Sequence, residues 1–128
     1  MILKAHFILY VTDQKASTNF YSTVLAKAPS LNVTGMTEFE LPGGGILGLM
    51  PANDIKQLLG AEMPDPNQAR GIPRAELYLL VDNPASYHER ALLAGALELA
   101  PLERRTWGHR ATYCLDPDGH VLAFATEE

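Results

Sequence analysis

Two ionisable side chains interrupt apolar segments of the chain, and they are the first candidates for chemistry. His6 lies within residues 2–11 and Glu76 within residues 75–81, and both segments are rich in large apolar side chains. A histidine beside a carboxylate can exchange protons, or it can bind a cation or a hydroxyl group of a ligand. We predict that His6 and Glu76 line one groove as a pair. The alternatives are that His6 is an ordinary buried histidine with its hydrogen bonds satisfied, or that it lies near solvent at the end of a strand.

A second group of candidates lies in the polar segment 103–109, which carries the only tryptophan. The ring of Trp107 could stack on a planar ligand, or it could pack against a neighbouring part of the protein. Arg104, Arg105 and Arg110 form the only basic cluster, which is either a solvated loop or a grip for an anionic group. Trp107 and Arg110 are therefore predicted to bind the ligand.

The composition excludes several classes of protein. Of the 128 residues, 47% are hydrophobic and 20% are charged, which is typical of a globular chain. The net charge of −5 argues against nucleic-acid binding. Cys114 is the single cysteine, so no intrachain disulfide or structural zinc cluster of cysteines can form, and we expect a small buried side chain there. No apolar run reaches the roughly 18 residues of a membrane span, so we expect no membrane partner and a cytoplasmic location.

The spacing of apolar residues predicts alternating strands and helices. Residues 62–73 contain three prolines and read as a loop. The predicted strands are 2–11, 36–41, 46–50, 75–81, 97–102, 111–116 and 120–126, and the predicted helices are 14–28, 52–59 and 84–95.

The second half of the chain repeats the first. A shift of 70 residues places His6 on Glu76, and a shift of 75 places Gly48 on Ala123. We therefore predict an α+β fold of two tandem βαβββ modules, whose curved mixed sheets enclose a groove. The single predicted domain, 1–128, consists of module 1–60, linker 61–73 and module 74–128.

Strand alternation predicts which side chains line this groove. Tyr10 shares a face with His6, Tyr78 shares one with Glu76, and Met50 shares one with Gly48. Such a groove is apolar and aromatic, which suits a hydrophobic or planar ligand. The alternative is that these side chains simply fill a core.

Two motifs connect this pattern to a known family. Phe20-Tyr21 is followed by Val24-Leu25, and a turn of sequence Asp-Pro-Asp-Gly occupies 116–119. Together with the duplicated βαβββ order, they resemble the vicinal oxygen chelate superfamily, which holds glyoxalase I, extradiol dioxygenases, fosfomycin-resistance enzymes and bleomycin-resistance proteins. The resemblance implies the fold and a homodimer, but its members bind, isomerise, oxidise or transfer on one scaffold.

The resemblance also implies where a metal would bind. Enzymes of this superfamily hold a divalent ion with four side chains, and the matching positions here are His6, Gly48, Glu76 and Ala123. Only His6 and Glu76 can be ligands, whereas a catalytic site needs at least three protein ligands. We therefore expect an incomplete metal site and no cofactor, although Zn, Mn, Ni or Fe would suit the two ligands that remain.

The sequence thus predicts a non-catalytic homodimer that binds a small, partly aromatic molecule, in the manner of antibiotic-sequestering relatives. The alternative is a metal-dependent enzyme of the same superfamily, such as a glyoxalase-like lyase or isomerase, a dioxygenase or a fosfomycin-type thiol transferase. Such an enzyme would recruit a third ligand from Glu38, Glu40, His109 or His120. A third possibility is a module that serves only protein interactions.

Overall fold

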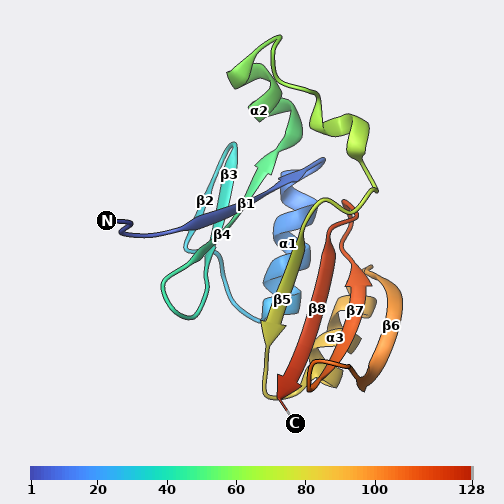
Figure 1. The fold of residues 1–128 in the computed structure, drawn as a ribbon. Helices are drawn as coiled ribbons and strands as arrows, with labels where there is room; N and C mark the ends of the chain where they lie inside the picture. The colour runs from blue at the N-terminus through green and yellow to red at the C-terminus, as the bar shows by residue number, and fades with distance from the viewer. Residues whose placement is uncertain (128) are drawn as a thin grey trace. The chain divides into compact units, whose positions relative to one another are not determined.

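The computed structural model describes residues 1–127, and within them eight strands form two four-stranded mixed sheets accompanied by three α-helices (Figure 1). The chain divides into two compact units. The first unit holds residues 1–22 and 26–70, and the second holds residues 23–25 and 71 onward. The predicted α+β fold of two βαβββ modules is confirmed. No helix among residues 1–127 is long and apolar enough to cross a membrane.

The first unit contains a sheet in the order β1-β4-β3-β2, in which β1 and β4 are parallel and the other neighbours antiparallel. A parallel pair needs a crossover connection, and a helix begins in the segment that follows β1. The elements are β1 (His6–Val11), α1 (Gln14–Leu25), β2 (Leu31–Val33), β3 (Met36–Glu40), β4 (Ile46–Pro51), α2 (Ala52–Leu59) and the short 3-10 helix η1 (Pro66–Ala69).

Alternation along β3 and β4 separates the two faces of this first sheet. Thr37, Phe39 and Leu47 are buried on one face. The hydroxyls of Thr37 and Thr18 lie 2.8 Å apart, so α1 contacts the sheet at this point through a hydrogen bond. Gln14 also donates to the Thr37 hydroxyl at 3.0 Å. His6 and its alternating neighbours therefore lie on the opposite face.

The second unit repeats this arrangement in the order β5-β8-β7-β6. Phe124 contacts Tyr87 of the helix at 5.4 Å between ring centroids, so the helix covers one face of the sheet. The Asn83 side chain caps this helix by accepting a hydrogen bond from the Ser86 N–H at 3.2 Å, and Pro84 occupies its first turn. The elements are β5 (Glu76–Leu80), α3 (Pro84–Leu93), β6 (Leu97–Arg104), β7 (His109–Leu115) and β8 (Val121–Glu127).

Several boundaries differ from the predicted ones. Strand β2 was not located from the sequence, because three residues are too few to show an alternating pattern. Residues 2–5 lie outside β1, and η1 lies within the predicted loop 62–73. The predicted polar loop 103–109 shortens to 105–108, because β6 and β7 pair as far as Arg104 and Arg110.

Two histidines are buried where the sequence favours exposure. His88 lies on a predicted helix and His120 near a turn. His88 is 7% exposed, and its Nε2 lies 2.7 Å from a carboxylate oxygen of Glu98 on β6. His120 is 3% exposed, and its Nε2 lies 3.2 Å from a guanidinium nitrogen of Arg74. Both histidines are therefore structural side chains of the second unit.

One glycine is required by a close approach of two backbone segments. Gly119 has φ +89°, and a Cβ at this position would lie 2.6 Å from the carbonyl carbon of Gly71. The Gly71 N–H donates to the Asp118 carbonyl at 3.1 Å, which holds the two segments together. The Asp-Pro-Asp-Gly turn therefore anchors the start of the second unit.

We expect Gly119→Ala to destabilise the fold by about 2–4 kcal/mol, since left-handed backbone strain adds to the steric clash with Gly71. Gly43→Ala is the matched control, because Gly43 has φ +87° but a Cβ there would meet nothing within 4 Å. Urea denaturation of both variants measures the difference in free energy of unfolding. Equal losses in the two variants would show that the approach of Gly71 contributes nothing.

Candidate functional site

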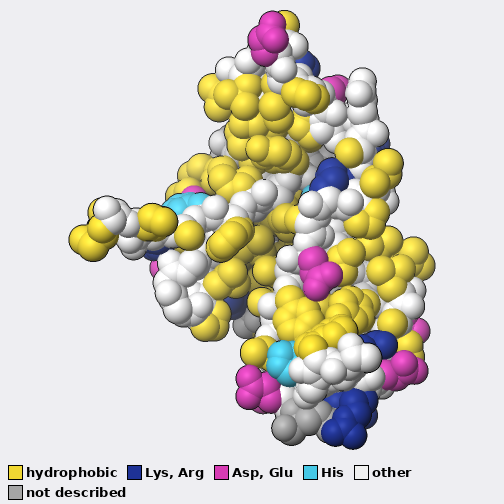
Figure 2. Space-filling view, viewed as in Figure 1, with side chains coloured by type: hydrophobic (Ala, Val, Ile, Leu, Met, Phe, Trp, Pro, Cys, Tyr) yellow, Lys and Arg dark blue, Asp and Glu magenta, His cyan; other side chains and the backbone are white. Residues whose placement is uncertain are grey.

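The face of the second sheet opposite α3 carries most of the aromatic candidates, and we call it the aromatic face. Tyr78 on β5, Ala123 on β8 and Tyr113 on β7 lie side by side in register. In the next row, Ala125 pairs with Ala111. Figure 2 shows hydrophobic side chains gathered over these strands, with acidic and histidine side chains beside them. The aromatic face therefore alternates tyrosine rings with alanine side chains.

A chain of hydrogen bonds joins three side chains of the aromatic face. The Trp107 indole Nε1 donates to the Tyr78 hydroxyl oxygen at 3.0 Å. The same hydroxyl lies 2.7 Å from Nδ1 of His109, and the two rings stack with centroids 5.8 Å apart. An indole N–H can only donate, so the Tyr78 oxygen accepts at that contact and its own proton is available to His109.

The register explains how Tyr78 reaches His109 across an intervening strand. Tyr78 is level with Ala123, whereas His109 is level with Glu127, four residues further along β8. Ala125 lies midway between these positions and is fully buried. A methyl group at this position leaves room for the Tyr78 ring to pass above it. A large side chain at 125 would block the contact.

Charged groups flank the aromatic side chains. Burial raises the pKa of Tyr113 above its ordinary value, and the charges of Glu76 and Tyr78 add to this, while Arg105 lowers it. The Arg105 guanidinium lies 5.3 Å from the centroid of the Tyr113 ring, within range of a cation–π contact. Glu76 itself is exposed, so its charge needs no buried partner.

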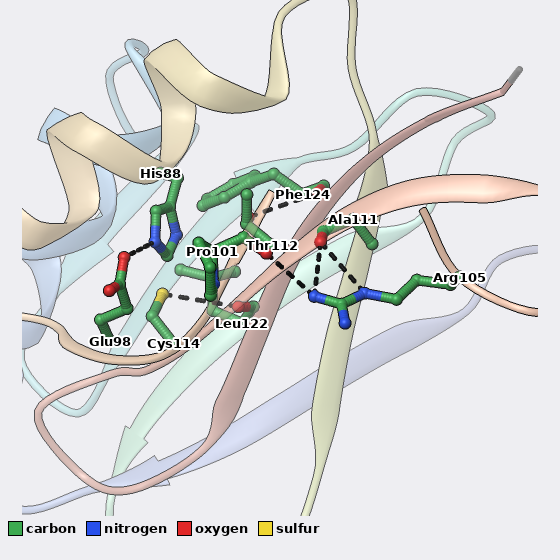
Figure 3. A network of polar contacts seen from close by, with 9 residues as sticks. All are labelled: His88, Glu98, Pro101, Arg105, Ala111, Thr112, Cys114, Leu122 and Phe124. Carbon is green, nitrogen blue, oxygen red and sulfur yellow. Dashed lines mark hydrogen bonds and ion pairs between the residues drawn. The ribbon is translucent and has the colours of Figure 1, made fainter. Parts of the chain in front are cut away.

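Arg105 also fixes the loop that carries Trp107. Its guanidinium donates to the carbonyls of Pro101 and Ala111, each at 2.9 Å, as the contact with Ala111 in Figure 3 illustrates. It further lies 3.5 Å from the Glu103 carboxylate. Arg105 therefore connects β6 and β7 and holds the base of the tryptophan loop.

A small hollow of about 290 Å³ lies at one end of β5 and β8. Its lining includes Leu80 and Glu127, which alternation places on the aromatic face. Since Glu127 pairs with His109, the hollow adjoins the hydrogen-bonded side chains. The aromatic face thus combines stacking surfaces, a few polar groups and a concave edge, as a small-molecule site requires.

The first unit holds the remaining predicted residues. His6 Nδ1 lies 3.4 Å from a Glu38 carboxylate oxygen, and Tyr10 pairs with Met50 across β1 and β4. The side chains of His6 and Glu38 are 42% and 21% exposed, so water screens their attraction. The sequence did not predict Glu38 as the partner of His6.

The predicted site residues therefore fall into separate groups. His6, Tyr10 and Met50 lie on one face of the first sheet, whereas Glu76, Tyr78 and Trp107 lie on the aromatic face. The pairing of His6 with Glu76 stays a prediction. Arg110 is not brought to the aromatic face, because alternation along β7 turns it away from the side that holds His109 and Ala111. The main residue missed as a ligand-binding candidate is His109, although its alternation with Tyr113 was visible in the sequence.

A second hollow among the described residues lies elsewhere, and the sequence did not predict it. It encloses about 840 Å³ in the first unit and is lined by residues 12–15, 18–19 and 32–34. Its walls are mostly hydroxyl, amide and charged side chains, with no aromatic ring. Gln14 fixes one wall by donating to the Val33 carbonyl at 2.8 Å and accepting from the Gly35 N–H at 2.9 Å.

Comparison with known proteins identifies the family. The sequence profile of the glyoxalase/bleomycin resistance protein/dioxygenase superfamily matches residues 4–124. The chain belongs to this superfamily. A glyoxalase-related enzyme from Fulvimarina pelagi superposes with a TM-score of 0.81 at 24% identity, covering 96% of this chain and 86% of that one. A superfamily enzyme from Burkholderia phytofirmans gives a TM-score of 0.82 at 16% identity, covering 97% and 98% of the two chains.

Sequence relatives give no activity. An uncharacterized protein of Mycobacterium bovis is 33% identical over 72 residues, which cover 56% of this chain and 47% of that protein. This chain thus covers about half the length of that relative. Membership of the glyoxalase superfamily therefore establishes the fold and leaves the ligand to be inferred from the site.

The residues present do not fit the metal centre of the superfamily's enzymes. Gly48 and Ala123 offer no ligand atom, and a Cβ at Gly48 would lie 3.0 Å from Ile8 and 3.3 Å from the Met36 sulfur. Among residues 1–127, no group of three His, Cys, Asp or Glu side chains is placed to hold a metal ion. Of the predicted third ligands, Glu38 lies beside His6, His109 contacts Tyr78, and His120 contacts Arg74.

The lone thiol offers no alternative chemistry. Cys114 is fully buried and donates to the Leu122 carbonyl at 3.4 Å on the helix side of the second sheet (Figure 3). Burial, with the charges of Asp116 and Glu98, raises the pKa of Cys114 to about 12. Both effects favour the protonated thiol, and the prediction of a small buried side chain at Cys114 is confirmed.

We expect Tyr78→Phe to move the single indole N–H resonance in the proton–nitrogen NMR spectrum, because Trp107 loses its acceptor. The resonance should shift upfield and exchange faster with water, and the variant should lose about 1 kcal/mol of stability. Tyr113→Phe is the control, since its hydroxyl makes no hydrogen bond to Trp107. An unmoved indole resonance in Tyr78→Phe would contradict the assigned hydrogen bond.

Proposed function

We propose that this protein binds a small planar aromatic molecule on the aromatic face and does so without catalysing a metal-dependent reaction. The observation that carries the proposal is the hydrogen-bonded group of Trp107, Tyr78 and His109. Trp107 is 53% exposed although its N–H is fixed, so a rigid ring is presented to solvent. A pre-oriented aromatic surface loses little entropy when a ligand stacks on it.

The surroundings support a ligand of this kind. Tyr113 and Tyr78 flank Ala123, which is fully buried, so the two partly exposed rings provide the apolar surface. Aromatic rings favour stacked or edge-on partners about 4.5–7 Å apart. The few polar groups, among them Glu76 and His109, can orient a ligand without giving the site a highly polar character.

The antibiotic-sequestering members of the superfamily suggest how such a protein would act in the cell. We propose that the protein acts as a homodimer in the cytoplasm and holds its ligand without a cofactor, as the sequence resemblance implied. The metal-dependent enzyme is not favoured, because Gly48 and Ala123 lack ligand atoms. The interaction module is not favoured either, because an aromatic face built around hydrogen bonds at 2.7 and 3.0 Å resembles a ligand site more closely.

A fluorescence titration tests the proposal, because Trp107 is the only tryptophan in the chain. We expect bleomycin or another planar aromatic compound to quench its emission saturably. By calorimetry, Trp107→Ala should weaken the same binding by roughly tenfold or more, which corresponds to about 1.4 kcal/mol. Leu93→Ala is the control, since Leu93 is an exposed apolar side chain on α3, on the other side of the sheet.

Two results would contradict the proposal. One is the absence of saturable binding across a broad panel of planar aromatic compounds. The other is product formation that appears only after Zn, Mn, Ni or Fe is added, which would favour the enzyme.

A further inference from the structure

The hydrogen bonds of Tyr78 define a direction in which a proton can move, from Tyr78 toward His109. This is a property that a stacking surface alone would not have. Trp107 donates to the Tyr78 oxygen at 3.0 Å, and His109 Nδ1 lies 2.7 Å from the same oxygen. When the Tyr78 hydroxyl donates to His109, Trp107 donates to Tyr78 and Tyr78 donates onward. The Tyr78 oxygen can then still accept one more hydrogen bond. A ligand held on the aromatic face would meet this oxygen.

We propose that Tyr78 and His109 form a proton relay that selects aromatic ligands carrying a weakly acidic O–H or N–H group, such as phenols. This inference rests on the proposed ligand site and names its ligand class. The ligand's O–H bond breaks, and its proton forms a new O–H bond on Tyr78. The original Tyr78 proton passes to His109 Nδ1. The ligand keeps the electron pair as an anion, and no oxidant or reductant is involved.

Groups of both charges lie near the pair. Glu127 carries a carboxylate and lies opposite His109 in the register, on the same face. The Trp107 N–H stabilises negative charge that develops on the Tyr78 oxygen during transfer. The other charged and titratable groups on the elements around the pair are Glu76 on β5, Asp82 after β5, Glu98, Glu103 and Arg104 on β6, Arg105 before β7, and Arg110, Tyr113 and Cys114 on β7.

The geometry also explains why His109 is needed in addition to a phenol. A tyrosine alone would hold a ligand proton only as a weak hydrogen-bond acceptor. A neutral imidazole has a nitrogen with a free electron pair, which can take up the proton that Tyr78 passes on. The Ala125 methyl beneath the path allows the two side chains to meet, so the relay depends on a small residue at that position.

A pair of matched probes tests the relay. 4-Nitrophenol carries an acidic O–H and becomes yellow when it loses the proton, whereas 4-nitroanisole has a methyl group in its place. We expect the wild-type protein to bind 4-nitrophenol about tenfold or more tightly than 4-nitroanisole. The bound 4-nitrophenol should show phenolate absorbance at a pH where the free compound is mostly protonated, a shift of its ionisation ratio by about tenfold.

His109→Gln is the diagnostic variant, because an amide oxygen can still accept from Tyr78 but cannot take its proton. We expect the ratio of the two dissociation constants to fall to about one and the phenolate absorbance to disappear. Tyr78→Phe should give the same result, and the indole resonance of Trp107 reports whether His109→Gln keeps the site folded. Leu93→Ala should retain the wild-type ratio.

The outcomes separate the relay from the proposed function. If wild type and His109→Gln bind both probes with the same ratio, the relay is wrong and the aromatic ligand site stands. If wild type prefers 4-nitrophenol but binds it in its protonated form, the relay is likewise wrong. If neither probe nor any other planar aromatic compound binds, the proposed function itself fails.

Discussion

The second unit depends on the fact that one helix covers one face of a four-stranded sheet. Alternation sends every second side chain of β5, β7 and β8 to the side away from α3. Phe124 and Leu122 pack on the helix side, where both are fully buried. The other side holds the partly exposed rings of Tyr78 and Tyr113 and a set of alanines that are fully buried.

Small residues are frequent on this side of the sheet. Ala111, Ala123 and Ala125 form a strip of small side chains, and alanine is a poor strand former. Their smallness lets Tyr78 lie across the sheet and reach His109. The alanines lower the strand propensity of these segments, and the same alanines allow the aromatic side chains to be pre-organised. Functional sites are where such departures from the residue types that best suit a strand are expected.

The sequence predicted the parts of this arrangement that depend on period and repetition. Alternation placed Tyr78 with Glu76 and Tyr10 with His6 on the correct faces, and the 70-residue shift revealed the duplicated modules. It could not predict contacts that depend on side-chain reach. The Tyr78–His109 hydrogen bond crosses a strand diagonally, and the His6–Glu38 contact joins β1 to β3 past β4.

Burial of single histidines was equally inaccessible from the sequence. His88 is buried because α3 packs against the Glu98 carboxylate, and His120 because the chain near Gly71 and Arg74 returns to the Asp-Pro-Asp-Gly turn. Both arrangements join distant segments, which a local pattern does not encode. Arg110 was predicted in the site as a member of the basic cluster that could grip an anionic group, whereas alternation turns it to the other side.

The central claim is that the aromatic face, and not the larger polar hollow of the first unit, receives a planar aromatic ligand. Amide chemical-shift mapping with 4-nitrophenol tests this most directly, because the two surfaces involve different residues. The account predicts shifts at Tyr78, Trp107, His109 and Tyr113, with none at residues 12–15 or 32–34. Shifts confined to those last residues would contradict it.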